Sequence, residues 1–195
     1  GRLVVMCGAG TSSPIGLPSS QALVRQTYVA LGESIDGDGP SAAERLTFKN
    51  NELDRTLRAL ERRLITPGPS GMAMRRRIRD AIRNQLKAPD SFDATDHLAL
   101  LTLSRNERHV PRLVTTNFDT LFERAAKQAG FYVASGAGAG LPRPGTDRSE
   151  GILHLHGRIA DQECGLEESD LILTSAEFGD AYLRDGWTSQ WLYAL

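Results

Sequence analysis

Cysteine is scarce in this sequence of 195 residues, which holds only Cys7 and Cys164. Two thiols cannot build a zinc site of four cysteines, and they do not provide the framework of paired cysteines that holds small secreted domains together. Because this usage is typical of a reducing, intracellular setting, we expect a cytoplasmic location. The four histidines are not arranged as metal ligands either, so no metal is expected.

Long hydrophobic runs and an excess of one charge are also missing. No apolar stretch approaches the roughly 18 to 20 residues that a membrane-spanning helix needs, so we expect no membrane contact. Lysine and arginine number 23 against 24 aspartates and glutamates, which gives a net charge of -1. Such a balance provides no general attraction to nucleic acid, and we do not expect direct nucleic-acid binding.

The two ends of the sequence show no natural boundary. It opens on an apolar run without an initiator Met, and its last residues, WTSQWLYAL, have a helical pattern. We therefore expect a fragment of a longer polypeptide. Its 195 residues suffice for one hydrophobic core and a small appended subdomain.

Short apolar runs typical of buried strands occur near the start of the chain and again after residue 111. Strands are expected at residues 3–7, 112–116, 131–135, 152–157 and 171–174, helices at 19–31 and 120–130, and a loop at 136–151. Strands separated by helices predict an α/β fold with a Rossmann-like open parallel sheet and helices on both faces.

Helix boundaries are marked by capping patterns. Thr120 with Glu123, and Thr174 with Glu177, have the spacing of a capping box at a helix start. Gly130 fits the residue that ends a helix, because glycine readily adopts the left-handed conformation found there.

Residues 41–105 contain no convincing strand pattern and are predicted to form an inserted helical block or cap. Three helical patterns follow one another in this block. Arg75, Arg79 and Arg83 share one face of the second, since they are spaced four residues apart. A solvated or partner-facing surface is the favoured interpretation of this face over a nucleic-acid site.

Ligands of open parallel sheets bind beyond the carboxyl ends of the strands. The stretch GAGTSS follows the first expected strand, and Gly8 and Gly10 permit a tight turn with close backbone approach. The amides and hydroxyls of Thr11 and Ser12 could then hold a diphosphate. An ordinary turn is the alternative. The dehydrogenase fingerprint is excluded because Ser13 replaces its third glycine.

The stretch TTNFD ends a second expected strand. Asn117 and Asp119 are two residues apart, so their side chains should lie on one side. Asp119 could instead cap the following helix. Asn117 needs hydrogen-bond partners at the tip of a buried strand, and a ribose hydroxyl or a positioned water would serve.

The stretch HLHG ends a third expected strand, with His154 and His156 predicted to point the same way. Only His156 reaches the carboxyl end, where Gly157 leaves space beside it. We therefore predict a functional role for His156. A satisfied structural histidine is the alternative, and it is the favoured interpretation for His154.

The motifs GAGTSSPIGLPSS, TTNFDTLFE and HLHG, in this order, resemble those of the sirtuin superfamily. They are most similar to bacterial sirtuin-like domains that hydrolyse NAD in antiphage defence, as is the segment LILTSAEFGDAYL. The resemblance implies a fold that binds NAD+ without hydride transfer, with Asn117 and His156 as catalytic residues. The implied cofactor-binding residues are Gly8, Ala9, Gly10, Thr11, Ser12, Thr116 and Asp119.

Two departures from the protein-deacylating sirtuins favour NAD+ hydrolysis over deacylation. Those enzymes continue Gly-Ile-Pro with Asp-Phe-Arg, whereas Gly16-Leu17-Pro18 is followed here by Ser-Ser-Gln. They usually also carry a four-cysteine zinc module, which two cysteines cannot form. A deacylase and a non-catalytic NAD or ADP-ribose sensing or scaffold domain remain the alternatives.

The resemblance also implies restraint of the activity and contacts outside this sequence. The expected partners are further copies of the chain, as a homo-oligomer, and an activating ATPase, Argonaute-like or phage-derived protein. Contacts to the adenine are expected beyond residue 195.

Overall fold

The computed structural model describes residues 3–144, 146 and 150–195. Residues 145 and 147–149, which belong to the loop expected at 136–151, lie outside this description. The chain divides into two compact units. We call residues 1–17, 87–172 and 181–195 the sheet unit, and residues 18–86 and 173–180 the helical unit.

The described part of the sheet unit contains a four-stranded parallel sheet. Its strands are β1 (Val5–Cys7), β2 (Arg112–Thr115), β3 (Ser135–Ala137) and β4 (Gly151–His154), in the order β1-β2-β4-β3. Cys7 pairs with Thr115, and His154 pairs with both Thr115 and Ala137, so the carboxyl ends of all four strands are level. The predicted Rossmann-like parallel sheet is confirmed.

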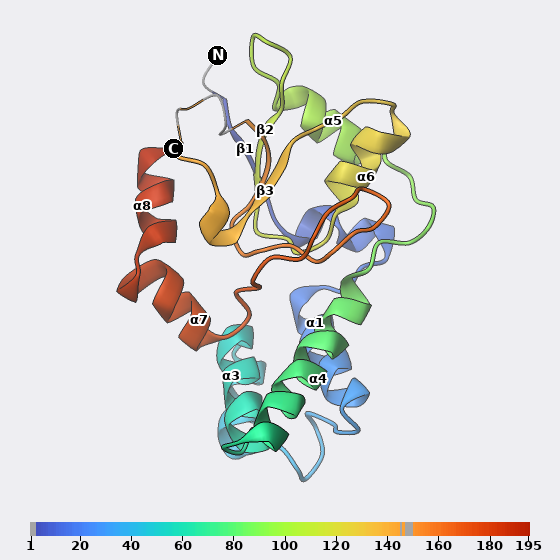
Figure 1. Ribbon diagram of the computed structural model, residues 1–195. Helices are drawn as coiled ribbons and strands as arrows, with labels where there is room; N and C mark the ends of the chain where they lie inside the picture. Colours follow the sequence, from blue (N-terminus) through green and yellow to red (C-terminus); the bar gives the residue numbers. More distant parts are fainter. Residues whose placement is uncertain (1–2, 145, 147–149) are drawn as a thin grey trace. The chain divides into compact units, whose positions relative to one another are not determined.

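Helices cover both faces of this sheet, as predicted. On one face, Leu113 and Ile152 are buried in a cluster with side chains of α5 (Thr95–Leu103) and α6 (Leu121–Gln128). On the other face, Val114 and Leu153 are buried with Trp191 of α8 (Trp187–Ala194). Figure 1 shows α5 and α6 together on one side of the strands and α8 on the other. Burial of each such side chain stabilises the unit by about 1.5–3 kcal/mol.

Two strand predictions were wrong because an apolar run can be buried without joining a sheet. The run expected at 131–135 becomes a strand only at Ser135, and Phe131 packs instead against the apolar cluster under α5 and α6. The run at 171–174 is buried but is not a strand, and its Ile172 N–H donates to the His156 carbonyl at 2.9 Å.

One of the two predicted capping boxes forms. Thr174 accepts from the Glu177 amide while the Glu177 side chain accepts from the Thr174 amide. The prediction of a capping box at the start of α6 was wrong. Thr120 makes no side-chain cap there, and its hydroxyl donates instead to Asp161 at 2.5 Å. The predicted stop after α6 is confirmed, since Gly130 has a φ of 77°.

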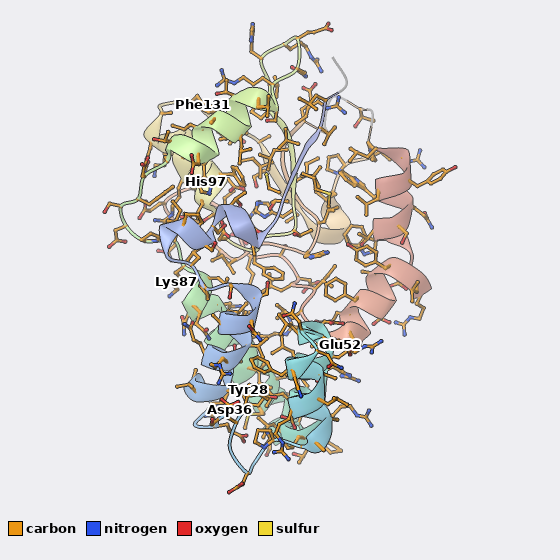
Figure 2. The ribbon with its side chains drawn as sticks, turned by 180° about the vertical axis from the view of Figure 1, so that it is seen from behind. Tyr28, Asp36, Glu52, Lys87, His97 and Phe131 are labelled. Atoms are coloured by element: carbon orange, nitrogen blue, oxygen red, sulfur yellow. The ribbon has the colours of Figure 1, made fainter. Side chains whose placement is uncertain are left out.

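The helical unit consists of α1 (Ser20–Ala30), α2 (Ala42–Lys49), α3 (Leu53–Leu64), α4 (Pro69–Leu86) and the short α7 (Ser175–Gly179). A buried polar network crosses it: the Tyr28 hydroxyl donates to Glu44 at 2.6 Å, and the Arg63 Nε donates to the same carboxylate at 2.8 Å. Figure 2 shows Tyr28 among these helices.

This unit differs in extent from the block expected at 41–105, because α1 joins it and α5 packs on the sheet. Among the described residues, no helix combines the length and the apolar character needed to cross a bilayer.

Candidate functional site

Three segments come together beyond the carboxyl ends of β1, β2 and β4. They are residues 8–12, 116–119 and 155–157, which contain the residues predicted from the three motifs. The Thr116 N–H donates to the Cys7 carbonyl at 3.1 Å, and the Leu155 N–H donates to the Thr115 carbonyl at 2.9 Å. These bonds extend the strand pairing and hold the segments next to each other.

The first segment is a tight turn. Ala9–Thr11 forms one turn of 3-10 helix, closed by a hydrogen bond of 3.0 Å from the Thr11 N–H to the Gly8 carbonyl. Gly8 has extended backbone, and a Cβ there would lie 3.5 Å from the Thr116 hydroxyl, an ordinary contact. A Cβ on Gly10 would meet no atom within 4 Å, so this glycine borders open space.

The space beside Gly10 and Thr11 is a cavity of about 350 Å³ that His97 of α5 also lines. Sequence reasoning found no role for His97. Its ring is fully buried and lies against the rings of Phe92 and Phe122, and neither ring nitrogen has a partner among the described residues. Burial lowers the pKa of His97, which favours the neutral ring.

A chain of buried hydrogen bonds joins the first two segments. The Ser12 hydroxyl donates to the Asp119 carboxylate at 2.7 Å, and the Asn117 amide nitrogen donates to the Ser12 oxygen at 2.9 Å. The same nitrogen lies 3.1 Å from the Thr11 hydroxyl. The two side chains that were predicted to share a side, Asn117 and Asp119, thus meet at Ser12.

This chain fixes the orientation of the Asn117 amide. Because Ser12 gives its one proton to Asp119, it can only accept from Asn117, so the NH2 group of Asn117 must face Ser12. The amide oxygen then lies on the opposite side and makes no hydrogen bond within the described part of the chain. It is available to accept a hydrogen bond from a bound hydroxyl or water.

Asp119 also performs the simpler role that the sequence allowed. Its second carboxylate oxygen accepts from the Leu121 N–H at 3.2 Å, at the start of α6. Burial raises the pKa of Asp119, while the bonds from Ser12 and Leu121 act against that rise. Asp119 is 4% exposed, so it supports the Asn117 segment from within.

His156 lies at the third segment, half-buried, and its Nε2 is 2.8 Å from the Tyr182 hydroxyl. The Phe118 ring centre is 6.5 Å from that of His156. Burial lowers the pKa of His156 to about 4, so the ring is neutral at pH 7 and can accept a proton. Tyr182 was not predicted; it belongs to the LILTSAEFGDAYL segment, which carried the only signal for it.

His154 has different surroundings, so the expectation that both histidines point the same way was wrong. The backbone leaves the strand after His154, although Leu155 still shares a buried cluster with Leu153, and His156 contacts Tyr182 instead. His154 is fully buried; its Nδ1 donates to the Asn117 carbonyl at 2.9 Å, and its Nε2 lies 2.8 Å from the Glu123 carboxylate.

The electrostatics of this pair favour two charged groups. Burial acts to lower the pKa of His154, but the Glu123 carboxylate and the Asn117 carbonyl raise it above its ordinary value. Burial acts to raise the pKa of Glu123, but His154 and a hydrogen bond from Ser135 lower it. The pair of His154 and Glu123 thus anchors the backbone of Asn117 through the Nδ1 atom of His154.

The described residues hold no group of three or more histidine, cysteine, aspartate or glutamate side chains arranged to bind a metal ion. The polar groups that meet at the strand ends are instead hydroxyls, an amide, a carboxylate and a neutral imidazole. Such a set can bind sugar hydroxyls and move a proton.

Comparison with known proteins agrees with the motifs. Residues 111–195 match the family model of the SIR2-like domain. An uncharacterized protein, y4cA, of Sinorhizobium fredii (strain NBRC 101917 / NGR234) is 39% identical over 199 residues. This similarity spans 100% of the chain but only 16% of that protein's length. SIR2-like domains use NAD+, so the match indicates an NAD-related function. The match to residues 111–195 supports the predicted membership of the chain in the sirtuin superfamily.

Proposed function

We propose that this domain is an NAD+ glycohydrolase that cleaves the bond between nicotinamide and ribose. The observation that carries the proposal is the fixed amide of Asn117, whose oxygen is turned away from Ser12 and made available at the strand ends. A neutral His156 follows the adjacent strand β4. An oriented acceptor and a base are what hydrolysis at a ribose carbon requires.

The chemistry needs little help for the leaving group. The nicotinamide ring is cationic in NAD+ and departs as a neutral molecule, taking the electrons of the broken C–N bond. The ribose then develops oxocarbenium character, and a water oxygen forms the new bond to carbon. His156 accepts the proton that this water loses, directly or by way of a ribose hydroxyl. General-base assistance of this kind typically contributes about 10²- to 10⁴-fold in rate.

The turn after β1 is proposed to hold the diphosphate, mainly through its backbone. The hydroxyl of Thr11 donates to the Gly8 carbonyl at 2.9 Å, and that of Ser12 donates to Asp119. Because these protons are already engaged, the chain from Gly8 through Ala9 and Gly10 is the part free to approach phosphate oxygens. Thr116 is proposed to contribute beside this turn. Asp119 is proposed to act on the nicotinamide-ribose side, through its bond with Ser12.

Depletion of NAD+ as an effector step of antiphage defence is the proposed role of the whole protein. Such an activity must be restrained until it is needed. A homo-oligomer, or an ATPase, Argonaute-like or phage-derived partner, is the proposed control. The chain spans 16% of the length of its relative, which leaves room elsewhere in such a protein for regions that sense or assemble.

The test is NAD+ turnover by the full-length protein, alone and together with the products of neighbouring genes. Nicotinamide and ADP-ribose are quantified by chromatography for the wild type, Asn117→Ala and His156→Ala. The matched control is His109→Asn, because His109 is exposed with a left-handed φ of 61°, which Asn tolerates. Thermal unfolding shows whether each variant is folded.

Release of both products, lost in the two site variants and retained in His109→Asn, would support the hydrolase. NAD+ that binds but is never cleaved, under any activating condition, would refute it and favour a sensing domain. Transfer of an acyl group from lysine to ADP-ribose would favour the deacylase instead.

A further inference from the structure

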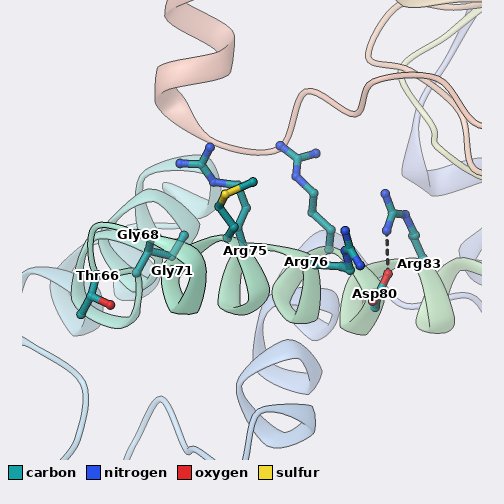
Figure 3. Close-up of a pocket in the computed structure, with 10 residues that line it drawn as sticks. Thr66, Gly68, Gly71, Arg75, Arg76, Asp80 and Arg83 are labelled. Atoms are coloured by element: carbon teal, nitrogen blue, oxygen red, sulfur yellow. Dashed lines mark hydrogen bonds and ion pairs between the residues drawn. The ribbon is translucent and has the colours of Figure 1, made fainter.

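A second concave surface lies in the helical unit and contains none of the proposed NAD+-site residues. It is a cavity of about 530 Å³ along α4, within the range of about 300–1,000 Å³ typical of small-molecule sites. Arg75, Arg76, Arg79 and Arg83 all line it. Figure 3 shows the side chains of this groove, with the ion pair of Arg83 and Asp80 dashed.

The positive charges of this groove exceed the negative ones. Arg83 pairs with Asp80 at 2.6 Å, and Arg79 pairs with Glu177 of α7. Arg75 and Arg76 are exposed and have neither hydrogen bond nor ion pair within the described ranges of the chain. Like charges four residues apart destabilise a helix slightly. A bound anion would relieve this repulsion between the arginines.

The spacing of the arginines suits an extended anion. Residues 75 and 83 are eight positions apart on α4, which corresponds to about 12 Å along the helix axis. Guanidinium groups bind phosphate oxygens in pairs through parallel N–H donors, and they do so more specifically than ammonium groups. Two or three linked phosphates bound at Arg75 and Arg76 would extend along this row toward Arg79.

The end of the groove near the start of α4 is apolar. Ile65 and Met72 line it, and Met72 is 77% exposed. Close packing shapes this end, because a Cβ on Gly71 would lie only 1.7 Å from the Thr66 carbonyl oxygen. Thioether side chains make favourable contacts with aromatic rings, so a planar base could lie against Met72.

We propose that the α4 groove binds a nucleoside polyphosphate, with its phosphates on Arg75 and Arg76 and its base at Met72. A small ligand fits better than a nucleic-acid strand. The groove is an open concave surface along one helix and has an apolar end. The chain as a whole has a net charge of -1, which offers no continuous basic track. Binding at this site in the helical unit would give the protein a means to sense nucleotide.

The proposal is tested on the full-length protein with a fluorescent ATP analogue, followed by anisotropy and by competition with unlabelled ATP and inorganic triphosphate. Arg75→Ala/Arg76→Ala is expected to weaken binding about tenfold or more, since each charge-assisted hydrogen bond to phosphate is strong. Arg77→Ala is the matched control: Arg77 is exposed on the same helix but does not line the groove, so affinity should stay within about twofold. Met72→Ala should weaken the binding of ATP more than the binding of triphosphate.

Three results would overturn the proposal. The first is no binding of ATP or triphosphate at physiological salt. The second is a loss of affinity in the Arg77→Ala control that equals the loss in Arg75→Ala/Arg76→Ala. The third is preference for a single-stranded oligonucleotide over ATP with a steep salt dependence, which would assign the surface to nucleic acid. NAD+ turnover is measured in parallel as the test of the proposed hydrolase. Only the binding measurements test the α4 groove.

Discussion

Replacement of Glu123 by alanine is expected to destabilise the sheet unit by about 3–5 kcal/mol, the usual cost of removing one partner from a buried ion pair. Glu123 and His154 are 5% and 0% exposed, and their contact is 2.8 Å long. Without the carboxylate, His154 must either lose its proton or remain as a buried uncompensated charge. The Nε2 atom would lose its hydrogen-bond partner in either case.

Glu123→Gln should cost much less, because the pair can reverse its hydrogen bond. The Nδ1 proton of His154 is committed to the Asn117 carbonyl, so a neutral ring has an acceptor at Nε2. The glutamine amide can donate to that acceptor. We expect a loss of about 1–2 kcal/mol, comparable with the exchange of a charged hydrogen bond for a neutral one.

The pH dependence separates these two states of His154. In the wild type the folded-state pKa is raised above that of the unfolded chain. The stabilisation is therefore fully present below about pH 6.5 and is lost as the pH rises through the folded pKa, with a slope of at most about 1.4 kcal/mol per pH unit. In the Glu123→Gln variant, burial lowers the pKa of His154 in the folded state. The contribution of His154 to the free energy of unfolding is therefore lost as the pH falls. The advantage of the wild type should therefore shrink from pH 6 to pH 8.

Tryptophan fluorescence during urea unfolding measures these differences, because both tryptophans, Trp187 and Trp191, lie in α8 of the sheet unit. A cost below about 1 kcal/mol for Glu123→Ala would refute the buried ion pair. Parallel pH profiles for the wild type and Glu123→Gln would refute the charged state of His154.

Two further predictions concern the strand ends. If His156 is the base, NAD+ turnover should be flat from about pH 6 to pH 8 and fall only toward its pKa of about 4, because the neutral ring is the active form; a half-maximum near pH 6.5 would contradict the burial effect. Gly157→Ala should lower the free energy of unfolding by about 3 kcal/mol or more, since the backbone has a φ of 89° and a Cβ would lie 2.0 Å from the Asp170 carbonyl oxygen. Gly140→Ala is the matched control, because Gly140 is exposed and no atom lies within 4 Å of the new Cβ. Equal melting temperatures of the Gly157→Ala and Gly140→Ala variants would contradict the packing argument.

Periodicity predicted those parts of the fold that face a core. The alternation of Leu113 with Val114, and of Ile152 with Leu153, follows directly from a sheet covered on both faces. It failed at residues 171–174, where the same apolar composition is buried without a ladder. Burial rewards apolar side chains whatever the backbone does, so composition alone cannot separate a strand from a packed loop.

Capping patterns show a related limit. Thr174 and Glu177 form their box although Arg79 also pairs with Glu177, because the box uses the other carboxylate oxygen. At the start of α6, Thr120 instead donates to Asp161, and Glu123 contacts His154. These competing partners are distant in sequence. Local spacing cannot reveal them, and the same holds for the bond between Tyr182 and His156.

Contacts in the candidate site were predictable where neighbouring parallel strands end side by side. Level carboxyl ends of β1 and β2 bring Ser12 to Asn117 across 105 positions of sequence, and parallel pairing requires this. The structural role of His154 was predicted, and its full burial and the partners of both its ring nitrogens agree with it. Its partner Glu123 was not predictable, because the two residues are 31 positions apart in the sequence.

The polar ending of β2 is explained by two independent restraints on one residue. The backbone carbonyl of Asn117 is held by His154, and its side-chain nitrogen is held by Ser12. With both ends of the residue fixed, the amide oxygen loses little further freedom when it binds a ligand, and preorganised groups of this kind contribute most to catalysis. His154 in turn contacts the Glu123 carboxylate at 2.8 Å, so this buried pair supports the backbone of Asn117. If Asn117 acts in catalysis as proposed, the cost of burying the pair is the cost of orienting that residue.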